Sequence, residues 1–353
     1  MPGRNDQEWT DSSARTSGRS EQTVRVSSKP APPVSVESVD FVEPDEPDSR
    51  TLNATDEPFY GDQWHLSSTL GFDINIHAVW EDYTGAGITV VVVDEGTDPT
   101  HPDLDDNLDP VNQIDSRNGD IGPGEGEPKG NADKHGTAVA GVIAAEDNDI
   151  GVVGVTYDAT LIAAYTPLSG DADEFAGLGY GVNFDVVNNS WGWNPGAFNP
   201  FPDNFLNQNS GGGVDASFYE YGLQLEGNSQ DGRGGLGTVY VFAAGNGGQS
   251  DDVNQLSFQS SRFTIAVGAT QESGETANFS TPGAAALLSA PGVDIATTDR
   301  VGSPGWNSGP GGDEDYAILD GTSFASPIVA GITALMLEAN GDLGVRDIQE
   351  IFA

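Results

Sequence analysis

The chain has 353 residues, 36% of them hydrophobic, so it can bury one large core. Its 55 acidic and 13 basic residues give a formal net charge of −42, which argues against nucleic acid and anionic membranes as partners because their phosphates would be repelled. The absence of cysteine excludes thiol catalysis, zinc–thiolate sites and disulfides. Such acidity fits a secreted, salt-adapted or calcium-binding protein, and equally fits simple solubility.

Residues 1–56 are rich in Ser, Pro, Glu, Asp and Arg and show little apolar periodicity, which predicts a disordered leader. No apolar stretch reaches the length of a membrane span, and residues 1–50 lack the apolar core of a signal peptide. The first cluster of large apolar side chains lies at residues 57–66. We therefore expect one folded domain over residues 57–353.

Short apolar runs alternate with helical patterns in this domain. The predicted strands, most of them buried on both faces, are 88–93, 160–165, 186–189, 238–243, 263–267 and 285–290. The predicted helices are 135–146, 218–225, 323–339 and 342–352, and the Gly- and Pro-rich segments 194–213 and 303–315 are predicted loops. This alternation predicts an α/β fold, a three-layer sandwich with a mostly parallel central sheet flanked by helices. The site should lie beyond the carboxyl ends of the strands.

Three polar residues stand at ends of predicted elements. Asp94 follows a strand, while His135 and Ser323 each open a helix. A serine hydroxyl becomes a strong nucleophile when an imidazole takes its proton and a carboxylate orients that imidazole. Each residue alone also has an ordinary explanation, as a turn acid, a helix-start residue and a helix N-cap. Together, in the order Asp, His, Ser, they predict a catalytic triad.

Two further features surround the predicted nucleophile. Asn246 lies in a Gly-rich turn after a strand, where its amide could stabilise a tetrahedral oxyanion together with the backbone N–H of Ser323. An asparagine beside glycine is also a common turn residue. Pro327 falls near the first turn of the helix that Ser323 opens, where a missing backbone donor is expected to cost little.

The segments around Asp94, His135 and Ser323 closely resemble the three signature motifs of the subtilisin-like serine endopeptidases. The resemblance covers about residues 57–353 and is greatest to the kexin and furin branch. The short blocks that carry it are 63–66, 73–75, 79–80, 232–237, 245–248, 337–340 and 346–347. It implies a subtilisin-like fold, hydrolysis of peptide bonds through an acyl-enzyme, and protein or peptide substrates.

Members of that branch cleave after basic residues in an acidic cleft. By resemblance, Ser190, Trp191 and Gly192 belong to the substrate-binding pocket, although the acids that usually follow this segment are absent here. The acids expected near the pocket are Asp251 and Asp252, and we assign Asp252 to substrate binding. Cleavage after basic residues is therefore an expectation from the family resemblance.

The loop at residues 145–152 resembles the family's structural calcium loop. The ligands that the resemblance implies are the side chains of Glu57, Asp103 and Asn148 and the backbone oxygens of Ala145, Ile150 and Val152. Oxygen ligands in this number suit calcium, although a solvated acidic loop is the alternative. A calcium requirement favours an extracellular or cell-surface location.

Other functions are open to the same sequence. A subtilisin-fold binding or self-processing module of a larger secreted or surface protein is the main alternative. A lipase or esterase is disfavoured because Ser323 lacks the Gly-x-Ser-x-Gly motif. The last predicted helix stops without a cap, so we expect a monomeric catalytic domain, truncated at its C-terminus, within a longer polypeptide.

Overall fold

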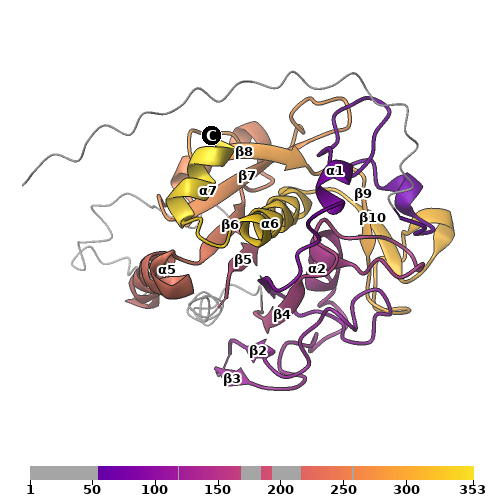
Figure 1. The fold of residues 1–353 in the computed structure, drawn as a ribbon, viewed down its shortest axis with the longest axis horizontal. Coiled ribbons are helices and arrows are strands. Elements are labelled where there is room, and N and C mark those ends of the chain that lie inside the picture. The colour runs from indigo at the N-terminus through magenta and orange to yellow at the C-terminus, as the bar shows by residue number, and fades with distance from the viewer. Residues whose placement is uncertain (1–54, 118, 168–183, 193–215, 257) are drawn as a thin grey trace, which may run out of the picture. The chain divides into compact units, whose positions relative to one another are not determined.

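The central feature is an eight-stranded sheet with the order β3-β2-β4-β1-β5-β6-β7-β8 (Figure 1). Its strands are β1 Thr89–Asp94, β2 Ile114–Asp115, β3 Asp120–Ile121, β4 Thr160–Tyr165, β5 Val186–Asn189, β6 Val239–Ala243, β7 Thr264–Thr270 and β8 Ala286–Pro291. All neighbouring strands pair in parallel except β2 and β3, which are antiparallel. The predicted mostly parallel sheet is confirmed.

This computed structural model describes residues 55–353 except 118, 168–183, 193–215 and 257, and of 216–221 only the backbone. The described residues fall within one compact unit, Leu52–Ala353. The predicted leader lies outside the described residues up to position 54, and so does the whole predicted loop at 194–213.

Two helical layers cover the two faces of the sheet. The helices are α1 His77–Trp80, α2 His135–Ala144, α5 Ala216–Gly235, α6 Thr322–Ala339 and α7 Val345–Phe352. Successive side chains of a strand point to opposite faces, and β1 shows this directly. Val90 and Val92 pack in the cluster that contains α2 and α6, whereas Val91 and Val93 pack in the cluster that contains Leu225 of α5. The three-layer α/β arrangement is therefore confirmed.

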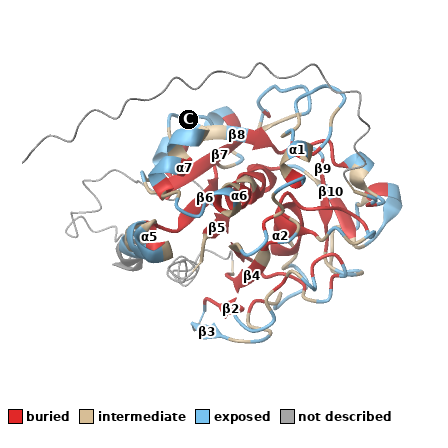
Figure 2. Ribbon diagram, in the orientation of Figure 1, coloured by how far each residue is buried: buried red, intermediate tan, exposed pale blue. Residues whose placement is uncertain are grey.

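Helix α6 lies in the interior of the domain (Figure 2). It is long and apolar enough to cross a membrane, but most of it is buried against the sheet and α2. No other helix among the described residues combines such length and apolar character. Its composition is thus explained by its place in the core.

A second, two-stranded antiparallel sheet packs beside α2. It pairs β9 Ile295–Thr298 with β10 Tyr316–Leu319, and neither strand was predicted. Thr297 and Thr298 donate hydrogen bonds to the carbonyls of Ala138 and Thr137 in α2, at 2.7 and 2.8 Å. Short 3₁₀ turns complete the fold: η1 Tyr60–Asp62, η5 Gly248–Ser250, η6 Val253–Gln255 and η7 Pro310–Gly312.

Candidate active site

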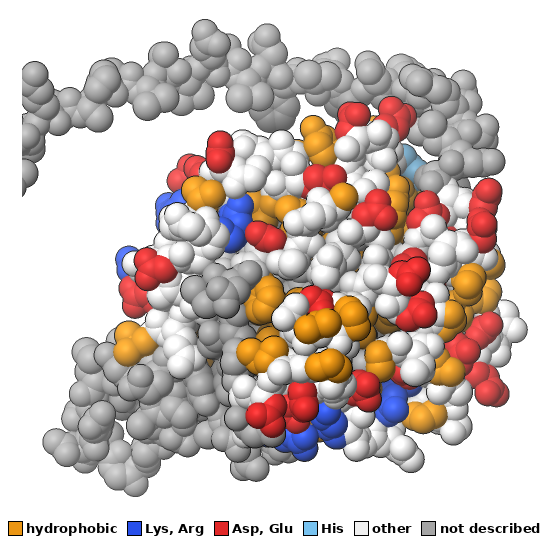
Figure 3. Space-filling view, turned by 60° about the horizontal axis from the view of Figure 1, so that its bottom comes forward, with side chains coloured by type: hydrophobic (Ala, Val, Ile, Leu, Met, Phe, Trp, Pro, Cys, Tyr) orange, Lys and Arg blue, Asp and Glu red, His pale blue; other side chains and the backbone are white. Residues whose placement is uncertain are grey.

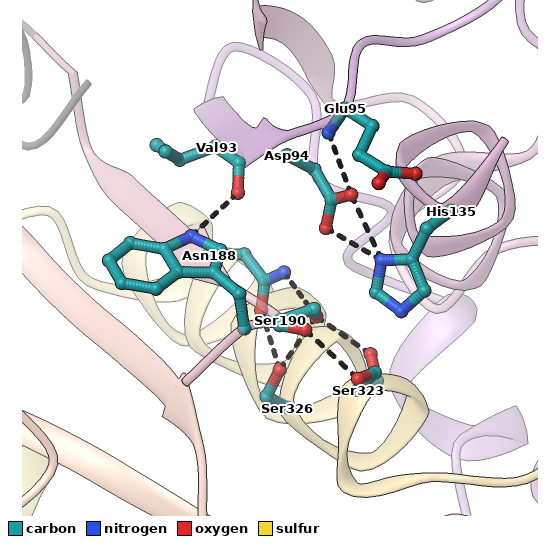
Figure 4. A network of polar contacts seen from close by, with 9 residues as sticks. Val93, Asp94, Glu95, His135, Asn188, Ser190, Ser323 and Ser326 are labelled. Atoms are coloured by element: carbon teal, nitrogen blue, oxygen red, sulfur yellow. Dashed lines mark hydrogen bonds and ion pairs between the residues drawn. The ribbon is translucent and has the colours of Figure 1, made fainter. Parts of the chain in front are cut away.

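Asp94 and His135 form an ion pair at the carboxyl end of β1 (Figure 4). Asp94 is fully buried, and its two carboxylate oxygens lie 2.9 and 3.0 Å from His135 Nδ1. This contact places the Nδ1 proton toward the carboxylate and leaves Nε2 available as a base. In Figure 4 the ring nitrogen that does not contact Asp94 points toward Ser323.

A glycine allows the start of α2 to approach the end of β1. A Cβ atom on Gly136 would lie only 2.4 Å from the carbonyl oxygen of Gly96. Any larger residue would push α2 away and separate His135 from Asp94. The small residue beside the histidine is thus needed for the ion pair.

The charges around the pair favour the protonated form of the His135 imidazole. Burial opposes charge on His135, but the negative charge and hydrogen bond of Asp94 outweigh it and raise the His135 pKa above its ordinary value. Glu95 adds a further negative charge, and its own pKa is raised by burial and by neighbouring Asp94. Sequence reasoning missed Glu95, although its place next to Asp94 was visible.

Ser323 is the second residue of α6 and has only 9% of its surface exposed. Its Oγ donates a hydrogen bond to the backbone carbonyl of Ser190, at 2.9 Å, so it does not use His135 as acceptor in this structure. Serine–imidazole contacts are often long before substrate binds, and one rotation about χ1 can redirect a hydroxyl. The three predicted triad residues therefore meet in one place.

Asn246 lies opposite the start of α6. Its Oδ1 accepts hydrogen bonds from the backbone N–H and the hydroxyl of Thr322, at 2.9 and 2.8 Å. These contacts turn the amide oxygen toward α6 and leave the Nδ2 donor beside the pocket that Ser323 lines. The orientation suits a donor to an oxyanion.

A pocket of about 370 Å³ opens next to Ser323. It is formed by the ends of β5 and β6 and by the start of α6, with walls from Ser190, Trp191, Gly192, Ala243, Gly245, Asn246, Gly247, Asp251, Leu256, Thr281, Thr322 and Ser323. The indole of Trp191 is held by a hydrogen bond to the carbonyl of Val93, at 3.0 Å. The three predicted pocket residues, Ser190, Trp191 and Gly192, all line it.

Of the residues that the structure describes, Asp251 is the acid that lines this pocket, and the assignment of Asp252 needs correction. Asp252 does not line the pocket; its carboxylate caps η6, accepting from the backbone and side-chain amides of Asn254 at 2.9 and 2.7 Å. Asp251 ends η5, and its carboxylate lies against Gly247, where a Cβ atom would be 1.5 Å from Oδ2. The turn between the two 3₁₀ segments sends the adjacent acids in different directions.

The predicted calcium residues gather around the loop at 145–152. Glu57 Oε1 accepts from the backbone N–H groups of Asn148 and Asp149, at 2.6 and 2.7 Å. Asp103 Oδ2 accepts from Val152 N at 3.0 Å. Among the described residues, the second oxygens, Glu57 Oε2 and Asp103 Oδ1, are buried and have no partner with hydrogen-bond geometry, although the Tyr316 hydroxyl lies near Asp103. Burial raises the pKa of Glu57 to about 7 and that of Asp103 to about 8. The negative charges of Asp147 and Asp149 also raise the pKa of Glu57, and that of Glu57 raises the pKa of Asp103.

These orphaned oxygens fit a cation with oxygen ligands, since an unpaired buried carboxylate is costly. Two of the other expected ligands already have partners: Ala145 O accepts from Gly154 N at 2.9 Å, and Asn148 Oδ1 accepts from Ile150 N at 3.0 Å. A carbonyl oxygen keeps a second lone pair, so both can still bind. Among the described residues no three His, Cys, Asp or Glu side chains cluster as a metal site, so backbone oxygens, including Ile150 and Val152, would be needed.

Comparisons with known proteins show the family to which the chain is related. The chain is 34% identical over 312 residues to proprotein convertase subtilisin/kexin type 7 of Mus musculus, covering 84% of this chain and 37% of that protein. It is 32% identical over 312 residues to furin of Homo sapiens, covering 84% and 36%. The chain thus spans little more than a third of the length of these curated relatives.

Solved structures give the same result for the fold. The serine protease of Aeromonas sobria, crystallised with its chaperone, matches with a TM-score of 0.71 and 25% identity, over 84% of this chain and 57% of that chain. Fervidolysin from Fervidobacterium pennivorans, a keratinolytic enzyme related to subtilisin, matches with a TM-score of 0.62, 24% identity and coverage of 84% and 42%. The predicted subtilisin-like fold is confirmed. The model of the subtilase family matches residues 85–352, and the chain therefore belongs to the subtilase family.

Proposed function

We propose that this chain is a serine endopeptidase that hydrolyses peptide bonds through Asp94, His135 and Ser323. The observation that carries the proposal is the ion pair between buried Asp94 and partly exposed His135, with 2.9 Å between Oδ1 and Nδ1, in which the free ring nitrogen of His135 faces Ser323 at the mouth of a pocket. When Ser323 Oγ attacks the peptide carbonyl, its proton passes to His135 Nε2 and Asp94 stabilises the imidazolium. His135 then protonates the leaving amine, and water hydrolyses the acyl-enzyme by the same route in reverse.

Asn246 would stabilise the oxyanion of each tetrahedral intermediate. Its Nδ2 group and the backbone N–H of Ser323 both lie beside the same pocket. Thr322 holds the amide in position before substrate arrives, so little reorganisation is needed when charge develops on the carbonyl oxygen.

The proposed activity can be tested with a panel of internally quenched peptides and with a phosphonofluoridate, which phosphonylates an activated serine. We expect turnover of at least one peptide, and a mass increase on the proteolytic fragment that contains Ser323. Peptide binding without turnover, together with no labelling, would instead support a binding module. Cleavage confined to bonds within the chain itself would indicate a self-processing module.

We propose further that the pocket prefers basic residues on the acyl side of the cleaved bond. Asp251 supports this, because a carboxylate in the pocket wall can pair with an arginine or lysine side chain. The surrounding charge acts in the same sense: Figure 3 shows Asp and Glu side chains spread over much of the face in view and few Lys and Arg. The net charge of −42 would attract cationic peptides toward the domain.

The adjacent acids Asp251 and Asp252 offer a matched test of this preference. Asp251→Asn should lower kcat/KM for peptides with arginine before the cleaved bond by about 10- to 100-fold, the range of a hydrogen bond to a charged group. Asp252→Asn removes the same charge one residue away, outside the pocket, and should change kcat/KM by less than about threefold. The measurement is kcat/KM on Arg and Leu versions of one peptide. If the ratio of kcat/KM for the Arg peptide to kcat/KM for the Leu peptide is the same in the wild type and in Asp251→Asn, basic specificity is contradicted.

We also propose that the Glu57–Asp103 site binds a structural calcium ion, with Asn148, Ala145, Ile150 and Val152 as the remaining ligands. The support is the pair of buried carboxylate oxygens that lack partners. The ion would neutralise both acids and tie the residues before η1 to the loop that follows α2. Extracellular calcium would keep such a site filled, which supports the expected location outside the cell.

Removing calcium should lower the melting temperature by about 5–10 °C, the effect of an ion present at about 100 times its dissociation constant on a domain of this size. Differential scanning fluorimetry in calcium and in EGTA checks this. Glu57→Gln should abolish the difference, whereas Asp62→Asn, which changes an exposed acid in the neighbouring turn, should retain it. Equal melting temperatures of the wild type in both buffers would contradict the calcium site.

A further inference from the structure

Pro327 creates a gap in the hydrogen bonding of α6 at the candidate nucleophile. Helix α6 begins at Thr322, so Pro327 is its sixth residue rather than part of the first turn as expected. A proline has no N–H, and in this position it removes the bond that would run to the carbonyl four residues earlier. That carbonyl belongs to Ser323. A buried carbonyl left without a donor is unfavourable, so a substitute is needed.

The hydroxyl of Ser190 supplies that substitute. Ser190 Oγ donates to the backbone carbonyl of Ser323 at 2.7 Å, from the end of β5 (Figure 4). A hydroxyl has one proton, so every other contact of Ser190 Oγ must be made as an acceptor. Asn188 Nδ2 fills this role, donating to Ser190 Oγ at 3.0 Å.

Ser326 completes the arrangement on the next turn of α6. Its Oγ donates to Asn188 Oδ1 at 3.0 Å and lies 3.0 Å from Ser190 Oγ. Asn188, Ser190 and Ser326 are each at most 2% exposed. The single protons of Ser326 and Ser190 go to Asn188 Oδ1 and to the carbonyl of Ser323, which fixes the orientation of the Asn188 amide and holds the Ser190 proton on Ser323.

Ser190 and Ser323 are therefore joined in both directions. The side chain of Ser190 donates to the carbonyl of Ser323, and the side chain of Ser323 donates to the carbonyl of Ser190, at 2.7 and 2.9 Å. The first bond is independent of the nucleophile's own rotation, because it holds the backbone. It remains when Ser323 Oγ turns toward His135.

We propose that Asn188, Ser190 and Ser326 are positioning residues for catalysis, which replace the helical hydrogen bond that Pro327 cannot make and so fix the backbone of Ser323. This inference rests on the proposed role of Ser323 as nucleophile. The Ser323 backbone carries both the nucleophilic Oγ and the N–H assigned to the oxyanion. A displacement of about 1 Å at such a group lowers the rate of the chemical step by about 100-fold.

The first test is the kinetic effect of Ser190→Ala, which removes the donor and leaves the pocket backbone in place. We expect kcat to fall by about 10- to 100-fold with KM within about twofold, as a misplaced nucleophile predicts. Ser326→Ala should lower kcat by a smaller factor, because it only releases the orientation of Asn188. Thr333→Val is the matched control: it removes a buried hydroxyl that donates to Val329 O at 2.7 Å on the same helix, away from Ser323.

The second test is a double-mutant cycle with Pro327→Ala, which restores the helical N–H. In the Pro327→Ala background the carbonyl of Ser323 has a donor again, so Ser190→Ala should cost less than about threefold in kcat and much less in melting temperature than it does with Pro327 present. A purely structural role of the Ser190 hydroxyl would lower stability, as Thr333→Val should, without this kcat effect and without rescue by Pro327→Ala.

The possible outcomes separate the two proposals. If the wild type turns over peptides and Ser190→Ala has the same kcat, the positioning network is contradicted. It is also contradicted if Ser190→Ala causes the same loss of activity and stability with Pro327 present as in the Pro327→Ala background. If the wild type turns over no peptide, the proposed function fails. The melting-temperature cycle still decides in that case whether Ser190 replaces the bond missing at Pro327.

Discussion

Ser323→Ala should lower kcat for peptide hydrolysis by about 10⁶-fold, since removing the nucleophile of a serine–histidine–aspartate triad eliminates the acyl-enzyme route. The small activity that remains would come from oxyanion stabilisation and substrate binding. The fold should be unaffected, because the Ser323 side chain makes its single hydrogen bond to a carbonyl at the pocket mouth. Steady-state hydrolysis of the best peptide and thermal unfolding of the same samples measure the two effects.

Ser116→Ala provides the control for this variant. Ser116 is also buried, but its hydroxyl has no hydrogen-bond partner within the described part of the chain, and it follows β2, away from the pocket. Its removal should leave kcat within about twofold of wild type, as for a substitution remote from the chemistry. Turnover by Ser323→Ala close to that of Ser116→Ala would remove Ser323 from the role of nucleophile.

The central sheet could be predicted because its strands carry a strong local signal. Buried parallel strands are apolar on both faces, and the run at 89–93 is uninterrupted valine after one threonine. The second sheet lacks that signal. Strands β9 and β10 have four residues each, and β9 is held by threonine contacts to α2 that no local pattern reveals.

Helix α5 keeps helical backbone angles up to Asp231, six residues beyond its predicted end at 225. Its second half is rich in glycine and polar residues, which favour a loop when read locally. The backbone departs from helical angles at Gly232, Arg233 and Gly234. The glycine-rich stretch therefore does interrupt the helix, but it does so later in the chain than predicted. Leu225, Asn228 and Ser229 are buried, and Asn228 donates to the Tyr240 hydroxyl of β6 at 2.8 Å, so tertiary packing extends the helix beyond its local preference.

The candidate active-site residues could be proposed from the sequence because each stands at an element end, whereas their supporting contacts depend on tertiary geometry. Asp251 and Asp252 are neighbours with the same charge, and only the backbone of the turn between η5 and η6 decides which one reaches the pocket. The role of Ser190 likewise requires knowing that β5 ends beside the carbonyl of Ser323. Sequence spacing contains no such information.

Asp94→Asn should lower kcat by about 10⁴-fold, because an amide holds the histidine in the wrong tautomer while leaving the geometry nearly intact. The pH profile should change as well. His135 acts as a base only when neutral, so the wild-type rate falls as the pH decreases through its raised pKa. Loss of the Asp94 charge lowers that pKa and moves the acidic limb of kcat/KM to lower pH.

The pH dependence of folding stability has the opposite sign to that of the rate. The ion pair stabilises the fold at low pH, and this contribution is lost as the pH rises through the His135 pKa.

Glu95→Gln distinguishes the effect of a nearby negative charge from the effect of the histidine tautomer. It removes a charge that also raises the pKa of His135, but it does not change the tautomer that Asp94 selects. Its acidic limb should move in the same direction by a smaller amount, while kcat stays within about threefold of wild type, since the Asp94–Nδ1 bond is untouched. The two profiles, measured between pH 5 and pH 9 on one peptide, distinguish the effects. An acidic limb that stays in place in Asp94→Asn, or a kcat equal to that of Glu95→Gln, would show that Asp94 does not act through His135.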